Sequence, residues 1–218
     1  MLFGDNSDAA KQAVNSIIPR DLSNFNWTFI ALLAVVFYIY WTEVRNKNWK
    51  AIVAGFSLYG VHWLYEIANA VIAKIFGYPL WAVSNESTSF VLLIGVSWEL
   101  SMMFSIAGII AYKMLPEDHS VRYFSRGNFK GIPCKFMTML SMSLLYAVFE
   151  IFLAATPAFI WVYPWWGAIP VFITTYVPFF IAAIYVPDKS PKFQKIFLAS
   201  IWGAVVLCLA ILIPCGVI

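Results

Sequence analysis

The chain has 218 residues, of which 62% are hydrophobic and only 11% are charged. A soluble globular domain carries about 25% charged residues, so this composition excludes a water-soluble globule and predicts an integral membrane protein. The net charge of +3 follows from where the basic residues lie around the apolar segments, and it gives no support to nucleic-acid binding.

The first 26 residues are polar and precede the first long apolar segment. Four apolar residues among them are spaced to share one side of a short helix: Ala10, Val14, Ile17 and Ile18. Pro19 would end this helix, and we expect it to lie on the outer surface of the membrane. Residues 1–26 are therefore predicted to form an interfacial segment, and residues 27–218 a single transmembrane domain.

Six apolar segments follow, each close to the length that a helix needs to cross ~30 Å of hydrocarbon at ~1.5 Å per residue. Alternating β-branched residues are missing from them, which argues against a barrel. The sequence therefore predicts an all-α, polytopic bundle of six transmembrane helices, at residues 27–44, 50–76, 89–114, 135–161, 166–186 and 194–216.

Most basic residues lie in or beside alternate connections, namely those after the first, third and fifth segments. These eleven of the 14 Lys and Arg residues are Arg45, Lys47, Lys50, Lys113, Arg122, Arg126, Lys130, Lys135, Lys189, Lys192 and Lys195. Lys and Arg favour the cytoplasmic side of a membrane. The pattern predicts that both termini lie on the outer side.

Three glutamates lie within three different apolar segments: Glu66, Glu99 and Glu150. Counted from the predicted helix ends, each is ~15 Å below the outer boundary, near the midplane. A carboxylate there costs at least about 2.5–3.5 kcal/mol on insertion scales, so such groups are usually paired, protonated or facing a polar cavity. We expect the three to meet in one interior chamber, where crowded carboxyl groups cannot all ionise.

Other side chains accompany these acids at helical spacing. His62 lies one turn before Glu66, and Tyr146 lies one turn before Glu150. Hydrogen bonding between helices is the simpler explanation for Thr174 and an equal alternative for Asn69 and Tyr146. The residues that we expect to line a substrate site are Tyr59, Trp63, Asn69, Trp98, Met102, Tyr146 and Thr174.

Carboxyl groups of this kind can supply a general acid and a general base together. In the leading hypothesis, Glu66 and Glu99 exchange a proton with the substrate, His62 relays it, and Glu150 helps to orient the substrate. No cofactor is predicted, because nucleotide-binding glycine loops are missing. A metal centre is less favoured, because the Glu-x-x-His pairing of di-iron bundles is missing too.

The segment GVHWLYE at residues 60–66, followed by Trp98-Glu99, resembles the EXPERA superfamily, which includes the sterol Δ8–Δ7 isomerases known as emopamil-binding proteins. Residues 176–178 are similar to the proline-bearing last helix of that family. The resemblance implies acid–base isomerisation of a sterol double bond in a small helical bundle, with His62, Glu66 and Glu99 handling the proton. The family's asparagine in its final helix has no clear match here, and the sixth segment is extra.

The Trp98-Glu99 pair also resembles membrane-integrated terpene cyclases, although their late aspartate is missing here. Both resemblances imply isomerisation or cyclisation of a lipophilic, isoprenoid-like substrate. Two other hypotheses use the same residues. The acids would suit a proton- or cation-coupled carrier or channel, and the small extramembrane mass would suit a non-catalytic subunit or lipid-binding module. The expected partners are the membrane and a lipophilic small molecule, with self-association or a larger complex left open.

Overall fold

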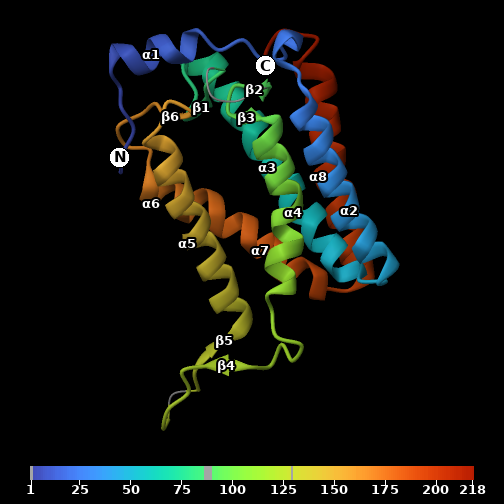
Figure 1. Ribbon diagram of the computed structural model, residues 1–218. Helices are drawn as coiled ribbons and strands as arrows, with labels where there is room; N and C mark the ends of the chain where they lie inside the picture. The colour runs from blue at the N-terminus through green and yellow to red at the C-terminus, as the bar shows by residue number, and fades with distance from the viewer. Residues whose placement is uncertain (1, 86–89, 129) are drawn as a thin grey trace.

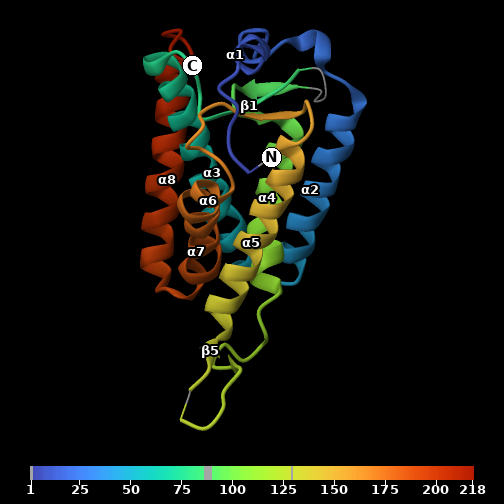
Figure 2. The same cartoon turned by 90° about the vertical axis from the view of Figure 1, so that its left-hand side faces the viewer.

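Long helices make up most of the computed structural model, which describes residues 2–85, 90–128 and 130–218. The helix α3 is central and packs against α2, α4, α7 and α8, while α5 packs mainly against α7 (Figures 1 and 2). The helices are α2 (Trp27–Arg45), α3 (Trp49–Phe76), α4 (Trp98–Lys113), α5 (Cys134–Ala154), α6 (Ala168–Val171), α7 (Val177–Tyr185) and α8 (Pro191–Leu212). The π-helical turn η2 (Phe172–Tyr176) joins α6 to α7, and the short helices η1 (Leu22–Asn24) and η3 (Val186–Asp188) lie in connections.

Polar residues define where several of these helices begin. The side chains of Asn26, Asn48 and Ser97 accept hydrogen bonds from backbone N–H groups in the first turns of α2, α3 and α4. Ser190 does the same for α8. Gly77 ends α3 with a φ of 88°, a left-handed conformation that glycine adopts without strain. These caps satisfy backbone groups that the helices themselves leave unpaired.

Short antiparallel ribbons close both ends of the bundle. At one end, β1 (Trp81–Val83) pairs with β6 (Phe159–Trp161), and β2 (Val91–Leu93) pairs with β3 (Val96–Ser97). At the opposite end, β4 (Arg122–Tyr123) and β5 (Ile132–Pro133) form a hairpin that protrudes from the bundle (Figure 1). Both termini lie toward the end that carries the β1–β6 ribbon (Figure 1).

The mostly helical architecture agrees with the predicted fold class, but two of the predicted helices are shorter in the structure and short strands continue them. Within the predicted segment 89–114, residue 89 lies outside the described residues, and the helix begins only at Trp98 because β2 and β3 come first. The predicted segment 135–161 ends as a helix at Ala154, before Pro157. Both errors arise because an apolar run of this length does not distinguish a helix from a buried strand that continues it.

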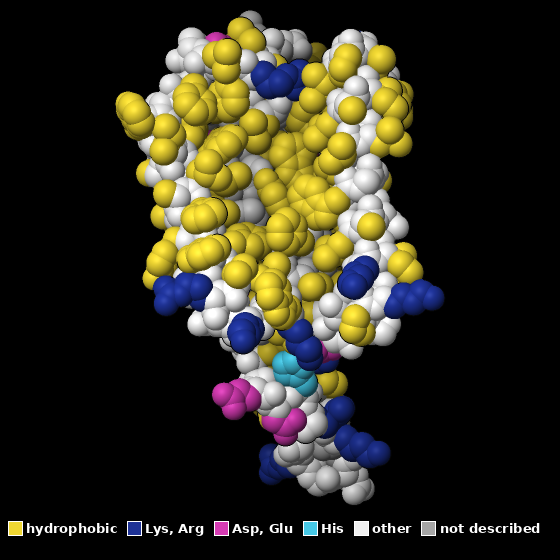
Figure 3. All heavy atoms as spheres, turned by 90° about the vertical axis from the view of Figure 1, so that its right-hand side faces the viewer, with side chains coloured by type: hydrophobic (Ala, Val, Ile, Leu, Met, Phe, Trp, Pro, Cys, Tyr) yellow, Lys and Arg dark blue, Asp and Glu magenta, His cyan; other side chains and the backbone are white. Residues whose placement is uncertain are grey.

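Among the described residues, four helical segments are long and apolar enough to cross a membrane: Trp27–Arg45, Cys134–Ala154, Ala168–Asp188 and Pro191–Leu212. The face formed by α2 and α8 is covered with apolar side chains, whereas Lys and Arg gather toward the β4–β5 end (Figure 3). An apolar band of this kind would be costly to expose to water. The protein is therefore an integral membrane protein with several helices long enough to span the bilayer.

The short helix α1 (Asp8–Asn15) forms where a helix was expected, but its apolar side contacts the protein. Val14 and Ile17 are buried in a cluster with Ala82 of β1, Val91 of β2 and Val162, which directly follows β6. The predicted helix is therefore present, with Val14 and Ile17 packed against the protein and Ile18 exposed, and its place at the membrane surface stays a prediction. The sequence could not reveal this packing, because the ribbons that cover the apolar side lie far along the chain.

A cluster of polar side chains surrounds Asp188 near the β4–β5 end. Its carboxylate accepts hydrogen bonds from Lys50 Nζ at 2.9 Å and from the Tyr112 hydroxyl at 3.0 Å. Lys135 Nζ lies 2.5 Å and His119 Nδ1 3.0 Å from its other oxygen. Because these residues belong to α3, α4, α5 and the connection after α4, the cluster holds this end of the bundle together.

Replacing Asp188 with Asn should lower the free energy of unfolding by about 1–2 kcal/mol, because Lys50 and Lys135 lose the charge that they share. Reversible unfolding in mixed micelles would measure the change. Asp118→Asn is the matched control: this exposed carboxylate bonds locally to Ser120, and its loss should cost less than about 0.5 kcal/mol. Equal losses in the two variants would contradict the assigned role of Asp188.

Candidate functional site

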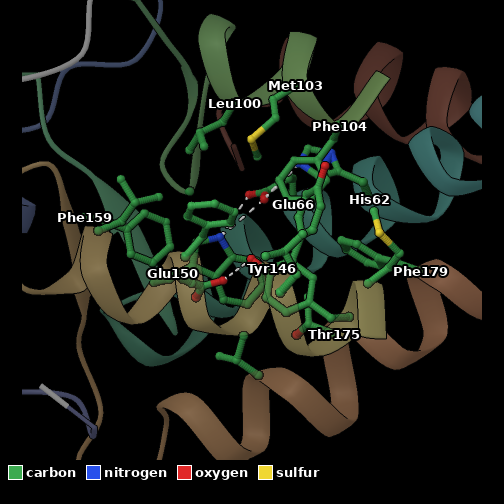
Figure 4. A pocket seen from close by; sticks show the side chains of 18 of the residues that line it. His62, Glu66, Leu100, Met103, Phe104, Tyr146, Glu150, Phe159, Thr175 and Phe179 are labelled. Atoms are coloured by element: carbon green, nitrogen blue, oxygen red, sulfur yellow. Dashed lines mark hydrogen bonds and ion pairs between the residues drawn. The ribbon is translucent and has the colours of Figure 1, made fainter. Parts of the chain in front are cut away.

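A cavity of about 260 Å³ lies between α3, α4, α5 and the α6–α7 segment, next to the β1–β6 ribbon. Most of the side chains that line it are apolar or aromatic. The polar side chains among them come from three different helical segments and turn toward the same space (Figure 4). They are His62 and Glu66 of α3, Tyr146 and Glu150 of α5, and Thr175 and Tyr176 of η2.

Glu66 is buried in the middle of α3, where it meets both a histidine and a tryptophan. His62 lies one turn earlier, and its Nε2 is 3.5 Å from Glu66 Oε1. The Trp81 indole N–H faces both carboxyl oxygens, at 3.3 and 3.2 Å. Trp81 belongs to β1, which is held against α3 by Asn69: the Asn69 amide donates to the Trp81 carbonyl and accepts from the Leu80 N–H, both at 2.8 Å.

Glu150 approaches the same cavity from α5, one turn before this helix ends (Figure 4). The Trp161 indole N–H donates to Glu150 Oε1 at 2.7 Å, and the Tyr176 hydroxyl donates to Oε2. Trp161 lies directly opposite Trp81 in the β1–β6 register, and opposite residues of an antiparallel pair point to the same face. One two-stranded ribbon therefore supplies an indole donor to each of the two acids.

Gly95 lies in the tight turn between β2 and β3, and because it has no side chain the carboxyl group of Glu66 can lie directly beside it. A Cβ at this position would lie 2.4 Å from Asn69 Nδ2 and 2.5 Å from both Glu66 Oε2 and Trp81 Nε1. No other residue type fits without displacing the carboxyl group. The hairpin therefore helps to define the position of Glu66, although it contributes no polar side chain to it.

Several buried polar atoms around the cavity have no hydrogen-bond partner among the described residues. They are both ring nitrogens of His62, the Thr175 hydroxyl and the Trp166 indole nitrogen. His62 instead lies between aromatic rings, with the Phe104 centroid 4.1 Å away. Within residues 2–85, 90–128 and 130–218, no group of three or more His, Cys, Asp or Glu side chains is placed to hold a metal ion.

The structure brings together two of the three predicted acids. Glu66 and Glu150 line the cavity, but Glu99 lies in the first turn of α4 and lines a neighbouring pocket with Val83 and Ser97. The number of helical residues between the acid and the end of its helix was predicted wrongly for Glu99 and Glu150, because α4 starts later and α5 stops earlier than predicted. Of the three acids, only Glu66 lies ten residues from the end of its helix, as predicted.

Of the predicted substrate-binding residues, Tyr146 lines the cavity, and the others lie outside it. In two cases the neighbouring residue takes the place: Met103 lines the cavity where Met102 was expected, and Thr175 where Thr174 was expected. The Thr174 hydroxyl donates to the Pro170 carbonyl at 2.7 Å, which is a local helical bond. The π-helical turn brings Thr175 and Tyr176 toward the cavity together.

The remaining predicted residues have structural contacts. Tyr59 shares a hydrogen bond of 2.7 Å with Ser101, between α3 and α4. Trp63 packs in an apolar cluster that α8 helps to form, and the Trp98 ring lies 5.9 Å from the Phe29 ring. Asn69 acts indirectly, because it holds the strand that carries Trp81.

Comparison with known proteins places the chain among membrane proteins. The model of a family described as "Uncharacterized membrane protein family" matches residues 7–214. The chain belongs to this family. A relative from Archaeoglobus fulgidus, described as an uncharacterized protein, is 37% identical over 185 residues, which is 84% of each chain. No solved structure matches the chain significantly.

Four residues of the site were not predicted from the sequence: Trp81, Trp161, Trp166 and Tyr176. Tryptophans near the ends of apolar segments are typical of interfacial belts, and the three tryptophans fit that pattern. Their contacts depend on the pairing of β1 with β6, which are nearly 80 residues apart in the chain. Tyr176 is marked in the sequence only by a resemblance, and no local spacing connects it to Glu150.

Proposed function

We propose that the protein is a membrane-embedded enzyme that performs acid–base chemistry, isomerisation or cyclisation, on a lipophilic, isoprenoid-like molecule. One observation carries the proposal: the carboxyl groups of Glu66 and Glu150, from two different helices, face one apolar cavity with His62 beside them. Carboxyl groups in such surroundings are uncommon in membrane proteins and usually serve a function.

In the proposed reaction, Glu66 gives a proton to one carbon of a substrate double bond. Loss of a proton from a neighbouring carbon to Glu150 then shifts the double bond, so that atoms and charge balance without an oxidant. Each turnover would leave Glu66 ionised and Glu150 protonated, and passage of that proton back through His62, 3.5 Å from Glu66, would reset the pair. Trp161 and Tyr176 hold both oxygens of Glu150, which fits a group that accepts a proton at a fixed position.

Aromatic rings around the cavity would stabilise the positive charge that forms on the substrate. Phe104, Tyr146 and Phe179 line the cavity close to His62 and the acids (Figure 4). The face of an aromatic ring attracts a cation. Trp63 and Trp98, which the sequence predicts to line the substrate site, lie outside the cavity, so the rings that line it would serve instead.

The resemblance to the EXPERA superfamily supports the chemistry in part. Its His-x-x-x-Glu pair corresponds here to His62 and Glu66, which share the cavity. In the present proposal Glu150 takes the role that the resemblance implied for Glu99. An ion carrier is less favoured, because the part of the cavity lined by Ile110, Met114 and Met142 offers an ion no polar side chain.

We further propose six membrane crossings, with the β1–β6 end on the outer side. The support is the concentration of Lys and Arg toward the β4–β5 end, together with the positions of both termini near the opposite end. In this arrangement α3 and α4 also cross the membrane, mostly covered by the surrounding helices.

Incorporation of solvent deuterium tests the proposed chemistry whatever the identity of the product. The purified protein in lipid nanodiscs would be incubated in D2O with a panel of isoprenoid alkenes, alcohols and ketones, and each compound would be analysed by mass spectrometry. A proton added to carbon during isomerisation or cyclisation would appear as carbon-bound deuterium. Incorporation that requires the protein supports the proposal, and none across the panel would count against it.

A further inference from the structure

The cavity opens sideways, between α4 and α5. Six apolar side chains belong both to its lining and to the exposed surface of these two helices: Met103, Ile110, Met114, Leu145, Phe149 and Leu153. Phe149 is 56% exposed and Met114 59% exposed, although each also borders the cavity. In Figure 1, α4 and α5 stand apart and the α6–α7 segment crosses behind them.

The position of this opening determines what can enter. It lies on the side of α5, one of the helices long and apolar enough to cross the membrane, so it faces hydrocarbon. Its six bordering side chains are all apolar, and an ion or a water-soluble metabolite would gain nothing from them. A molecule dissolved in the bilayer could pass between α4 and α5 without leaving the apolar phase.

The inner part of the cavity indicates the chemistry of the group that binds there. The Trp166 indole N–H can only donate a hydrogen bond, and it has no partner among the described residues. The Thr175 hydroxyl and the ring nitrogens of His62 are also buried without hydrogen-bond partners in the part of the chain that the structure describes. A ligand that satisfies Trp166 must carry an acceptor atom. An ammonium group has none, whereas a hydroxyl or carbonyl oxygen does.

The size of the cavity agrees with partial entry of a long molecule. Its volume of about 260 Å³ is slightly below the ~300–1,000 Å³ that is typical of sites for drug-sized ligands. A lipid tail would therefore extend through the opening and remain in the bilayer, while the polar end lies among the acids.

We infer that the opening between α4 and α5 is the entrance for a bilayer-dissolved lipid whose polar end is an uncharged hydroxyl or carbonyl group. That end lies beside Trp166, Thr175 and His62, and the apolar chain leaves between Met103 and Leu145. This entrance and this class of lipid deepen the proposed function, and that such a lipid is also converted rests on the proposed function. Binding can be measured without turnover.

Equilibrium binding of a radiolabelled 15-carbon isoprenoid alcohol to the protein in nanodiscs tests the inference. The matched primary amine and the matched hydrocarbon serve as competitors. The alcohol should bind at least tenfold more tightly than either. Equal or tighter binding of the amine or the hydrocarbon would overturn the assigned head-group chemistry, as would the absence of saturable alcohol binding.

Two sets of variants locate the ligand. Leu145→Trp fills the opening and should weaken alcohol binding at least tenfold, whereas Leu207→Trp, on the exposed surface of α8, should change it less than twofold. Met103→Trp replaces Leu145→Trp if thermal unfolding shows that the latter does not fold. Thr175→Val and Trp166→Phe should each weaken binding of the alcohol about fivefold and leave binding of the hydrocarbon unchanged. Normal binding to a folded variant with a blocked opening would overturn the route.

The outcomes separate the two proposals. Alcohol binding that depends on Leu145 and Thr175, without deuterium incorporation, would uphold the entrance and overturn the acid–base function. Deuterium incorporation that survives Leu145→Trp unchanged would uphold the function and overturn the entrance.

Discussion

Glu66→Gln should reduce protein-dependent deuterium incorporation by at least about 100-fold, since general acid–base catalysis commonly contributes 10²–10⁴-fold. Gln keeps the size of the side chain and an oxygen that accepts from the Trp81 indole, so the contact with β1 survives. It cannot give or take a proton at neutral pH. The rate of incorporation, measured by mass spectrometry at saturating substrate, reports the loss directly.

Glu99→Gln is the informative comparison for this variant. Glu99 lines a different pocket, with Ser97 and Val83, so its replacement should leave incorporation within about threefold of wild type. The hypothesis drawn from sequence alone assigns Glu99 to the proton transfer and expects the opposite result. Loss of activity in Glu99→Gln with full activity in Glu66→Gln would refute the assignment to the cavity.

Gly108→Ala should destabilise the protein by about 3 kcal/mol, at the upper end of the range for an overpacked core. Gly108 lies where the backbone of α3 comes close to α4: a Cβ there would be 2.3 Å from the Ala54 carbonyl oxygen and 2.7 Å from its carbon. These are backbone atoms of a packed helix and cannot turn aside. The two helices would have to separate, and α3 carries both His62 and Glu66.

Gly203→Ala provides the matched control for stability. Gly203 lies within α8, and a Cβ there meets no atom within 4 Å among the described residues. Alanine favours a helix over glycine by about 0.5–1 kcal/mol, so this variant should be equal to wild type or slightly more stable. Unfolding of both variants in mixed micelles would measure the difference, and equal stability of the two would contradict the close packing of α3 on α4.

Spacing along the sequence correctly predicted which residues lie together when both residues belong to the same helix. His62 and Glu66 are four residues apart, and the structure places them 3.5 Å apart on α3. Tyr146 and Glu150 share a face of α5 in the same way and line one cavity. The prediction of an integral membrane protein was confirmed, because apolar length and composition determine it directly.

Contacts between distant segments could not be predicted from the sequence. Glu99 was placed at the depth of the other acids because the apolar run before it was taken for helix, whereas residues 91–97 form a hairpin. The two indoles that meet the acids depend on the pairing of Trp81 with Trp161 across the chain. The rotation of a helix about its axis determines which of two neighbouring residues, such as Thr174 and Thr175, faces the cavity. The π-helical turn changes this rotation by a fraction of a turn, and the sequence does not reveal the turn.

The central claim is that Glu66 and Glu150 face one cavity that is open to the hydrocarbon of the membrane. A lipophilic carbodiimide, which adds covalently to carboxyl groups that it meets from the apolar phase, tests it most directly in native membranes. Peptide mapping by mass spectrometry should find the adduct on Glu66 or Glu150, and Leu145→Trp should suppress it. An adduct on Glu99, with Glu66 and Glu150 both unmodified, would contradict the account.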